Sequence, residues 1–137
     1  MRILNILTSR RIKGNTGEDY AAKFLKRRGF RILERNYVSR GHEIDIIAHN
    51  KDTVIFVEVK TRTKGLENPK EPRPASSVNK EKQKAIIMTA KGYLAFTRPD
   101  KHIRFDIIEV YLNEKGKPVE ICHMESAFTA DTAYKKY

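Results

Sequence analysis

The chain has 137 residues and a hydrophobic fraction of 39%, which suits one domain built around one core. It carries 28 Lys and Arg residues against 17 Asp and Glu residues, and residues 1–40 alone hold eleven basic and three acidic side chains. The net charge of +11 suits a polyanionic partner such as a nucleic acid, and a solvated basic surface explains it equally well.

The cysteine content and the apolar runs indicate where the protein works. Its single cysteine, Cys122, excludes an internal disulfide framework and a cysteine-based zinc cluster, and it favours a reducing compartment. The first residues have the wrong order of apolar and basic side chains for a secretory signal, and no apolar run approaches membrane-spanning length. We therefore expect a cytoplasmic, soluble protein with no membrane partner.

A first amphipathic helix is predicted over residues 17–28. Asn15 or Thr16 can cap its start, and Gly29 can end it. Its basic side chains fall on the side opposite the apolar stripe. The stripe consists of Ala21, Ala22, Phe24 and Leu25.

Three strands and a long loop are predicted after this helix. Residues 30–38 alternate apolar and polar side chains like a half-buried strand, and the β-branched runs at 43–48 and 53–60 are typical of buried strands. Residues 61–77 hold three of the five prolines, so we expect an irregular loop, either functional or disordered.

A second helix is predicted from Ser76 or Ser77 to about Phe96, with Pro99 marking its end. Its core side is assigned to Val78, Ala85, Ile86, Tyr93 and Phe96. The aromatic side chains of the chain fall at core periodicities, so we do not expect them to stack on bases. The aromatic residues concerned are Phe24, Phe56, Tyr93, Phe96 and Phe105.

The C-terminal part is predicted to hold two more strands. Residues 102–111 read as a buried strand, 119–124 as a weak edge strand, and 125–137 as a short helix or tail.

The resulting order, α-β-β-β-α-β, predicts an α/β fold in which helices flank a mixed central sheet. We expect a single domain over residues 1–137, with its core at about 15–112. A basic lead-in at 1–14 precedes this core, and a C-terminal edge strand and tail at 113–137 follow it.

Two acids face each other in the hairpin predicted between the second and third strands. A turn centred on residues 51–52 pairs His49 with Val54 and, further along the same register, Asp45 with Glu58. Their Cβ atoms would lie about 5 Å apart, where like charges destabilise a sheet. A positive group is therefore expected between them.

Either a lysine or a divalent cation can supply this charge. The register places Lys60 on the same face as Glu58 and opposite Glu43, which allows a structural ion-pair network. Hard carboxylate oxygens on Asp45 and Glu58 also suit Mg²⁺ or Mn²⁺. Such an ion activates water and neutralises a phosphate under attack, and Lys60 can stabilise the same developing charge. The set is suited to metal-assisted phosphodiester hydrolysis.

Glu18, on the first helix, has two equally supported interpretations. It lies on the inward stripe beside small residues, where it can add an acid to the site. It also occupies the capping-box position three residues after Asn15, where a carboxylate complements the helix dipole.

These motif residues resemble a known group of nucleases. The D…E-x-K pattern of Asp45, Glu58 and Lys60, with Glu18 on the preceding helix, resembles the core of the PD-(D/E)xK restriction-endonuclease-like superfamily. Within it, the chain is most similar to the YraN-like family of bacterial proteins, over most of its length up to about residue 110. The residues that carry this resemblance are Gly17, Glu18, Ala21, Gly29 and Asn36, with the runs 43–48, 56–62 and 104–106.

The resemblance implies a role for each motif residue. Asp45 and Glu58 would be metal ligands, Lys60 the catalytic lysine and Glu18 an auxiliary acid. The chain is also similar to archaeal Holliday junction resolvases and tRNA-splicing endonuclease-like domains, which implies a nucleic-acid substrate. Related resolvases work as dimers, so a homodimer is one option.

The chain departs from the family pattern at two positions. Ile44 stands where the superfamily often has proline before its aspartate. His42 stands where the YraN-like family usually has glycine, and it either reaches the site or faces solvent.

Several basic residues are candidates for guiding a phosphate backbone towards the site. For the loop, the alternative is a disordered solvent segment, and for the second helix it is a solvated face. The candidates are Arg62, Lys64, Lys70 and Arg73 in the loop and Lys80 and Lys84 in the helix. Arg104 and Asp106, on one face of the fourth strand, are instead predicted to form a buried structural pair.

Three functions remain open on the sequence alone. The leading hypothesis is a metal-dependent nuclease that acts on DNA, with branched or structured DNA as an option and DNA favoured over RNA. The second is a non-catalytic nucleic-acid-binding module that keeps the nuclease fold. The third is an adaptor whose basic surface binds an acidic protein.

Overall fold

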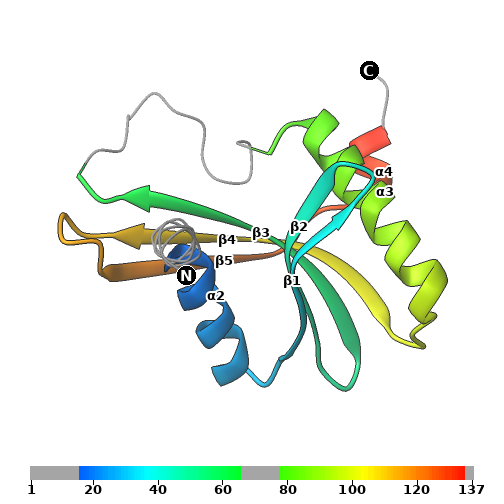
Figure 1. Ribbon diagram of the computed structural model, residues 1–137, viewed down its shortest axis with the longest axis horizontal. Helices are drawn as coiled ribbons and strands as arrows, with labels where there is room; N and C mark the ends of the chain where they lie inside the picture. Colours follow the sequence, from blue (N-terminus) through cyan, green and yellow to red (C-terminus); the bar gives the residue numbers. More distant parts are fainter. Residues whose placement is uncertain (1–15, 66–77, 135–137) are drawn as a thin grey trace, which may run out of the picture.

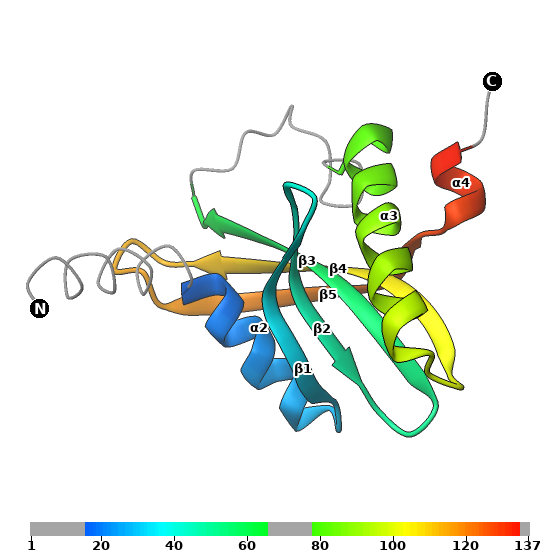
Figure 2. The same cartoon turned by 45° about the vertical axis from the view of Figure 1, so that its right-hand side comes forward.

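A five-stranded mixed sheet forms the centre of the molecule, with helices on both faces (Figures 1 and 2). The computed structural model describes residues 16–65 and 78–134, with only the backbone of Tyr134. The elements, in chain order, are α2 (Thr16–Arg27), β1 (Arg31–Ser39), β2 (His42–His49), β3 (Thr53–Thr63), α3 (Lys80–Thr97), β4 (His102–Leu112), β5 (Pro118–Phe128) and α4 (Ala130–Tyr134).

The strands lie side by side in the order β1-β2-β3-β4-β5. The first three form an antiparallel meander, α3 crosses over so that β4 runs parallel to β3, and β5 returns antiparallel. One core cluster lies between the sheet and α3, and the other lies between the sheet and α2. The predicted α/β fold and its α-β-β-β-α-β order are therefore confirmed.

The first helix, α2, approaches the sheet closely because its inward residues are small. Gly17 faces Thr61 of β3, and a Cβ atom at this position would collide with the Thr61 side chain. This contact holds Glu18, the next residue, against the sheet. Gly29 follows the helix with a φ of +90°, as the predicted stop requires. Three residues of the predicted stripe are buried: Ala21, Ala22 and Leu25.

The second helix, α3, begins later than predicted. Asn79 caps it, because its side-chain oxygen accepts a hydrogen bond from the backbone N–H of Lys82 at 2.8 Å. The predicted caps, Ser76 and Ser77, are therefore wrong, and both lie outside the described residues. Asn15, a predicted cap of the first helix, also lies outside them.

Phe96 does not belong to the core, contrary to the prediction. Its exposed fraction is 91%, whereas Ile86, Ile87 and Ala90 of the same helix are buried. Phe96 lies nine residues after Ile87, which is two and a half helical turns, so the two side chains point in opposite directions.

Two chain segments differ in extent from their predictions. Strand β3 continues to Thr63, so Arg62 lies in a strand and not in the predicted loop, of which residues 66–77 are outside the described part. The predicted weak edge strand is longer, Pro118–Phe128, and leads into the short helix α4. Among residues 16–65 and 78–134, no helix combines the length and apolar character needed to cross a membrane.

Candidate metal centre

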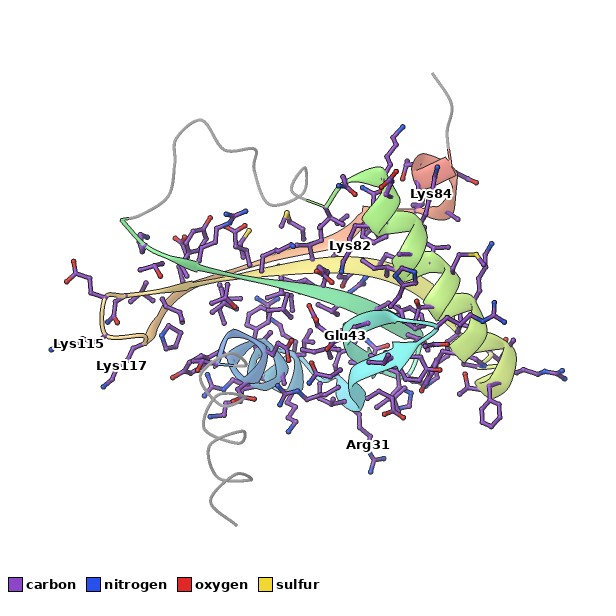
Figure 3. The ribbon with its side chains drawn as sticks, turned by 45° about the horizontal axis from the view of Figure 1, so that its top comes forward. Arg31, Glu43, Lys82, Lys84, Lys115 and Lys117 are labelled. Carbon is purple, nitrogen blue, oxygen red and sulfur yellow. The ribbon has the colours of Figure 1, made fainter. Side chains whose placement is uncertain are left out.

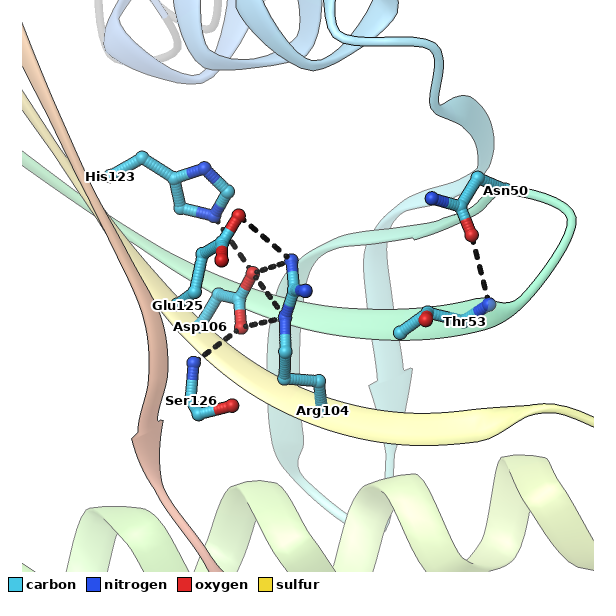
Figure 4. Close-up of polar contacts among 7 residues, drawn as sticks. All are labelled: Asn50, Thr53, Arg104, Asp106, His123, Glu125 and Ser126. Carbon is cyan, nitrogen blue, oxygen red and sulfur yellow. Dashed lines mark hydrogen bonds and ion pairs between the residues drawn. The ribbon is translucent and has the colours of Figure 1, made fainter.

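The turn between β2 and β3 sets the register of their hairpin. The side-chain oxygen of Asn50 accepts a hydrogen bond from the backbone N–H of Thr53 at 2.9 Å (Figure 4). This bond closes the turn where the sequence predicted it. His49 pairs with Val54, so the predicted register is confirmed from this pair as far as Ile46 and Val57.

The ladder between β2 and β3 ends at the pair Ile46–Val57, one pair before Asp45 and Glu58. The Oδ2 atom of Asp45 instead accepts a hydrogen bond from the backbone N–H of Val59 at 2.8 Å. A carboxylate therefore satisfies the backbone at the point where the two strands separate. Asp45 still lies close enough to Glu58 to raise the pKa of that acid.

An irregular residue in β1 coincides with this separation. Asn36 lies opposite Asp45, between the pairs Arg35–Ile46 and Tyr37–Ile44. Its φ of +52° is a left-handed conformation that asparagine tolerates better than most residues. In Figures 1 and 2 the tip of the β1–β2 hairpin curls away from the plane of β3 beyond this point.

Three acids meet beside the gap: Glu18 of α2 and Glu43 and Asp45 of β2. One oxygen from each lies within 4.8 Å of one oxygen from each of the others. With its amide nitrogen turned towards the acids, Asn36 donates to Glu43 Oε1 at 2.6 Å and to Glu18 Oε2 at 3.1 Å. Figure 3 shows Glu43 on the hairpin, between α2 and α3. This acid cluster (Glu18, Glu43 and Asp45) is a set of hard oxygen donors that could hold a metal ion.

Burial and the neighbouring acids disfavour the ionised form of Glu18. The side chain of Glu18 is only 14% exposed. Burial and the charge of Asp45 raise the pKa of Glu18 to about 7, and a hydrogen bond with Asp45 and the charge of Glu43 act in the same direction. The guanidinium of Arg35, 3.6 Å from Glu18 Oε2, opposes this rise. Glu18 thus lies beside Asp45, as expected if it adds an acid to the site.

Two lysines flank Glu58 on the α3 side of the gap. The side-chain nitrogens of Lys60 and Lys82 lie 3.6 and 3.9 Å from Glu58 Oε1. Burial and Asp45 raise the pKa of Glu58 to about 7, and both lysines act against this rise. Asp45 therefore lies near both the other two acids of the cluster and Glu58, which has two cationic neighbours.

The predicted pairing of Lys60 with Glu43 is wrong. Strand β2 pairs with β3 only from Ile46 to His49, so the antiparallel register does not reach Glu43 and Lys60. Glu43 pairs with Val38 of β1, and Lys60 pairs with Glu109 of the parallel strand β4. Glu43 consequently joins Glu18 and Asp45 instead of a lysine.

Arg62 and Lys64, predicted to bind nucleic acid, contact acids of the neighbouring strands. The Nε atom of Arg62 lies 3.5 Å from Oε2 of Glu109, which is fully buried. The side-chain nitrogen of Lys64 lies 3.6 Å from Oε1 of the exposed Glu120 on β5. Arg62 and Lys64 therefore each have an acidic partner within the protein.

The other predicted contacts lie near the start of α3 or outside the described residues. Lys80 and Lys84 are in the first turns of α3. Figure 3 shows Lys84 on the same helix as Lys82. Lys70 and Arg73 fall in the segment 66–77, outside the described part.

A second polar network confirms the structural pair predicted in β4. Arg104 Nε and one terminal nitrogen each lie 2.9 Å from the carboxylate of the fully buried Asp106 (Figure 4). His123 Nε2 lies 2.7 Å away, and the backbone N–H of Ser126 donates at 3.0 Å. Burial alone would raise the pKa of Asp106, but these hydrogen bonds and the charge of Arg104 hold it below its usual value. This network joins β4 to β5.

Three residues at the site were not assigned to it from the sequence: Arg35, Asn36 and Lys82. Lys82 lies four residues before the buried Ile86, so helical periodicity could have placed it at the edge of the inward face. Asn36 belongs to the family motif, but its left-handed conformation depends on the local bend of β1. Nothing in the local pattern of β1 distinguishes Arg35 from a solvent-exposed arginine.

The chain is similar to proteins of one bacterial family. A model described as "Uncharacterised protein family UPF0102" matches residues 17–110. A UPF0102 protein of Alkaliphilus oremlandii is 46% identical over 118 residues, which cover 84% of this chain and 96% of that protein. A UPF0102 protein of Dictyoglomus thermophilum is 42% identical over 116 residues, which cover 84% and 95%.

One solved structure, Pyrococcus furiosus SfsA in complex with Ca²⁺, is also similar. It gives a TM-score of 0.33 at 19% sequence identity, and the match covers 84% of this chain and 63% of the SfsA chain. The family match extends over both strands of the hairpin and over most of β4, and so includes the motif residues quoted above. The chain belongs to the UPF0102 family, the YraN-like family that its motif residues resemble.

Proposed function

We propose that this protein is a metal-dependent nuclease that hydrolyses phosphodiester bonds in DNA, with Mg²⁺ or Mn²⁺ as its cofactor. The position of Asp45 carries this proposal. Asp45 borders Glu18 and Glu43 on one side and Glu58 on the other, and Lys60 lies next to Glu58. A site of this kind combines oxygen donors for a cation with a fixed positive charge for a phosphate.

The side chains present fit a divalent cation. Carboxylate oxygens are the donors that Mg²⁺ and Mn²⁺ prefer, and Asp45 can contribute one together with Glu58 or together with Glu18 and Glu43. Because the pKa values of Glu18 and Glu58 are raised to about 7, protons partly compensate the repulsion among these acids in the metal-free protein. When bound, such an ion would supply activation of water and neutralisation of charge on the phosphate.

The remaining steps fall to the residues of this chain. Lys60, whose side chain is 32% exposed, can bind a phosphate oxygen and stabilise the charge that develops on it. Lys82 approaches the same carboxylate from α3 and can orient the phosphate from the other side. Glu18 has a pKa near neutrality, which suits a group that accepts a proton during attack by water.

The ion pairs of Glu58 also support a second candidate, the non-catalytic nucleic-acid-binding module. Both lysines lie within 4.0 Å of Glu58 Oε1, so this acid is compensated even without a metal. In such a module, Asp45, Glu58 and Lys60 would hold the hairpin to α3, and nucleic acid would bind without being cleaved.

A cleavage assay tests the proposal against this alternative. Purified protein is incubated with linear, nicked, flapped and four-way DNA and with matched RNAs, in Mg²⁺, Mn²⁺ or chelator. We expect metal-dependent cleavage that Glu58→Gln and Lys60→Met nearly abolish and that Glu114→Gln, in the exposed β4–β5 turn, leaves unchanged. Binding without cleavage on every substrate would favour the module, and cleavage that persists in chelator would refute the metal mechanism.

A further inference from the structure

A groove of about 450 Å³ lies between the tip of the β1–β2 hairpin and α3. The hairpin contributes one wall and the second half of α3 the other. The side chains that define its character are Tyr37, Arg40 and His42 on the hairpin and Met88, Lys91 and Phe96 on α3.

The groove combines apolar and basic side chains. Phe96 and Met88 have exposed fractions of 91% and 52%, which is unusual for such large apolar residues. Arg40 and Lys91 add two positive charges, and no acid is among the described residues that line the groove. Aromatic faces beside a cationic path are the features that bind single-stranded nucleic acid, because bases stack and phosphates are neutralised.

The hairpin tip holds Arg40 in an unfavourable backbone conformation. Ser39 pairs with His42, so Arg40 and Gly41 are the two central residues of the turn, with φ values of +53° and +80°. Both positive values suit a type I′ turn, in which asparagine is preferred at the first central position. The turn thus presents an arginine at the mouth of the groove where asparagine would be more stable.

The hairpin separates this groove from the acid cluster. Successive side chains of a strand point to opposite faces, so His42 and Glu43 lie on opposite sides of β2. His42 lines the groove, and Glu43 belongs to the acid cluster. A nucleic-acid strand bound in the groove would therefore lie on the opposite side of the hairpin from a nucleic-acid strand bound at the acid cluster. The two single strands of a forked DNA could take these two positions.

We infer that the groove binds an unpaired nucleotide, with its base on Phe96 and its phosphate at Arg40 and Lys91. The preferred substrates then carry a single-stranded segment beside the cleavage site. The inference rests on the proposed function for the choice of nucleic acid as partner, but the binding it describes requires no cleavage.

The test separates stacking from charge by measuring binding over a salt series. Fluorescence anisotropy in chelator follows a short labelled single-stranded DNA, the same sequence as RNA, and a blunt DNA duplex, between about 50 and 200 mM salt. Phe96→Ala should weaken binding of the single strand about 5- to 150-fold with an unchanged salt slope. Arg40→Asn, which suits the turn, should lower the salt slope by about 0.7.

Two matched controls lie at the opposite end of the sheet. Lys117→Gln removes an exposed cation from the β4–β5 turn (Figure 3), and Val119→Ala shortens an apolar side chain that is 51% exposed. Both should bind the single strand like the unmodified protein. Because Phe96 is exposed, its loss should leave the melting temperature unchanged, so a binding defect cannot be attributed to unfolding.

Three results would overturn the inference: unchanged single-strand affinity in Phe96→Ala, an equal loss on duplex and single strand, or dissociation of a dimer by Phe96→Ala with unaltered DNA binding. The last result would assign the groove to a second copy of the chain. Cleavage is measured separately with Glu58→Gln, so the two ideas can fail independently. Phe96-dependent binding without cleavage would contradict the proposed function alone, and cleavage without Phe96-dependent binding would contradict this inference alone.

Discussion

The Oδ2 atom of Asp45 accepts a hydrogen bond from the backbone N–H of Val59, 2.8 Å away, where β2 parts from β3. Asp45 therefore has two properties that substitutions can separate. Its acceptor satisfies the backbone of β3, and its charge adds to the repulsion among the acids of the site. Asparagine keeps an acceptor but loses the charge, whereas alanine loses both.

Without metal, we expect Asp45→Asn to be as stable as the unmodified protein or more stable. The amide oxygen can still accept from Val59, and the removed charge relieves Glu18 and Glu58. Asp45→Ala should unfold more easily than Asp45→Asn by about 1–3 kcal/mol, because a partly buried backbone donor is left unsatisfied. Denaturant melts in chelator give both values. A clearly destabilised Asp45→Asn would identify Asp45 as a structural ion-pair residue.

Metal should stabilise the unmodified protein and not Asp45→Asn. At about a hundred times its dissociation constant, Mg²⁺ or Mn²⁺ adds ~2.7 kcal/mol, provided that the unfolded chain does not bind it. Thermal melts of both proteins with and without metal measure this increment. If Asp45→Asn gained the full increment, the cation would be held elsewhere.

The metal-free protein should lose stability relative to Asp45→Asn as the pH rises. Glu18 and Glu58 have pKa values of about 7 in the folded protein, raised from 4.5. The folded state therefore binds more protons between these values, so this stabilisation is complete below pH 4.5 and is lost as the pH rises through 7. The melting temperatures of the two proteins should diverge from about pH 5 to about pH 8. Burial contributes to both raised pKa values in either protein, so a constant difference across that range would contradict the contribution of the Asp45 charge to them.

The second polar network should affect stability without affecting metal binding. Asp106→Ala leaves Arg104 without its buried partner and should cost about 3–5 kcal/mol in the free energy of unfolding. Glu125→Ala is the matched control, because Glu125 lies 3.6 Å from the same arginine but is 61% exposed. It should cost less than about 1 kcal/mol. Mn²⁺ affinity measured by calorimetry should be unchanged in Glu125→Ala and in the folded fraction of Asp106→Ala. A weaker Mn²⁺ affinity in folded Asp106→Ala would place this network within the metal site.

The hairpin could be predicted from the sequence because its signals are local. Runs of β-branched residues and a turn after Asn50 set the pairing of His49 with Val54, and from it the proximity of Asp45 and Glu58. Where that ladder ends could not be predicted. It stops at Ile46–Val57 beside a left-handed Asn36, so Glu43 meets Glu18 and not Lys60.

The remaining site residues come from elements whose placement depends on packing between layers. Helical periodicity places Lys82 at the edge of the inward face of α3, but its contact with Glu58 depends on where α3 crosses the sheet. The sequence predicts Phe96 on the same side of the helix as Ile86 and Tyr93, but Phe96 lies half a turn out of phase with the buried Ile87. Aromatic spacing alone did not distinguish a core side chain from an exposed one.

The most direct test of the metal-dependent nuclease is the single-turnover cleavage rate as a function of Mn²⁺ concentration in the unmodified protein, Asp45→Asn and Glu114→Gln. We predict rates that rise to saturation in the unmodified protein and in Glu114→Gln, and a fall of at least about 100-fold in Asp45→Asn, although that variant stays folded. Cleavage by Asp45→Asn at the rate of the unmodified protein, or cleavage that does not respond to Mn²⁺, would contradict the account.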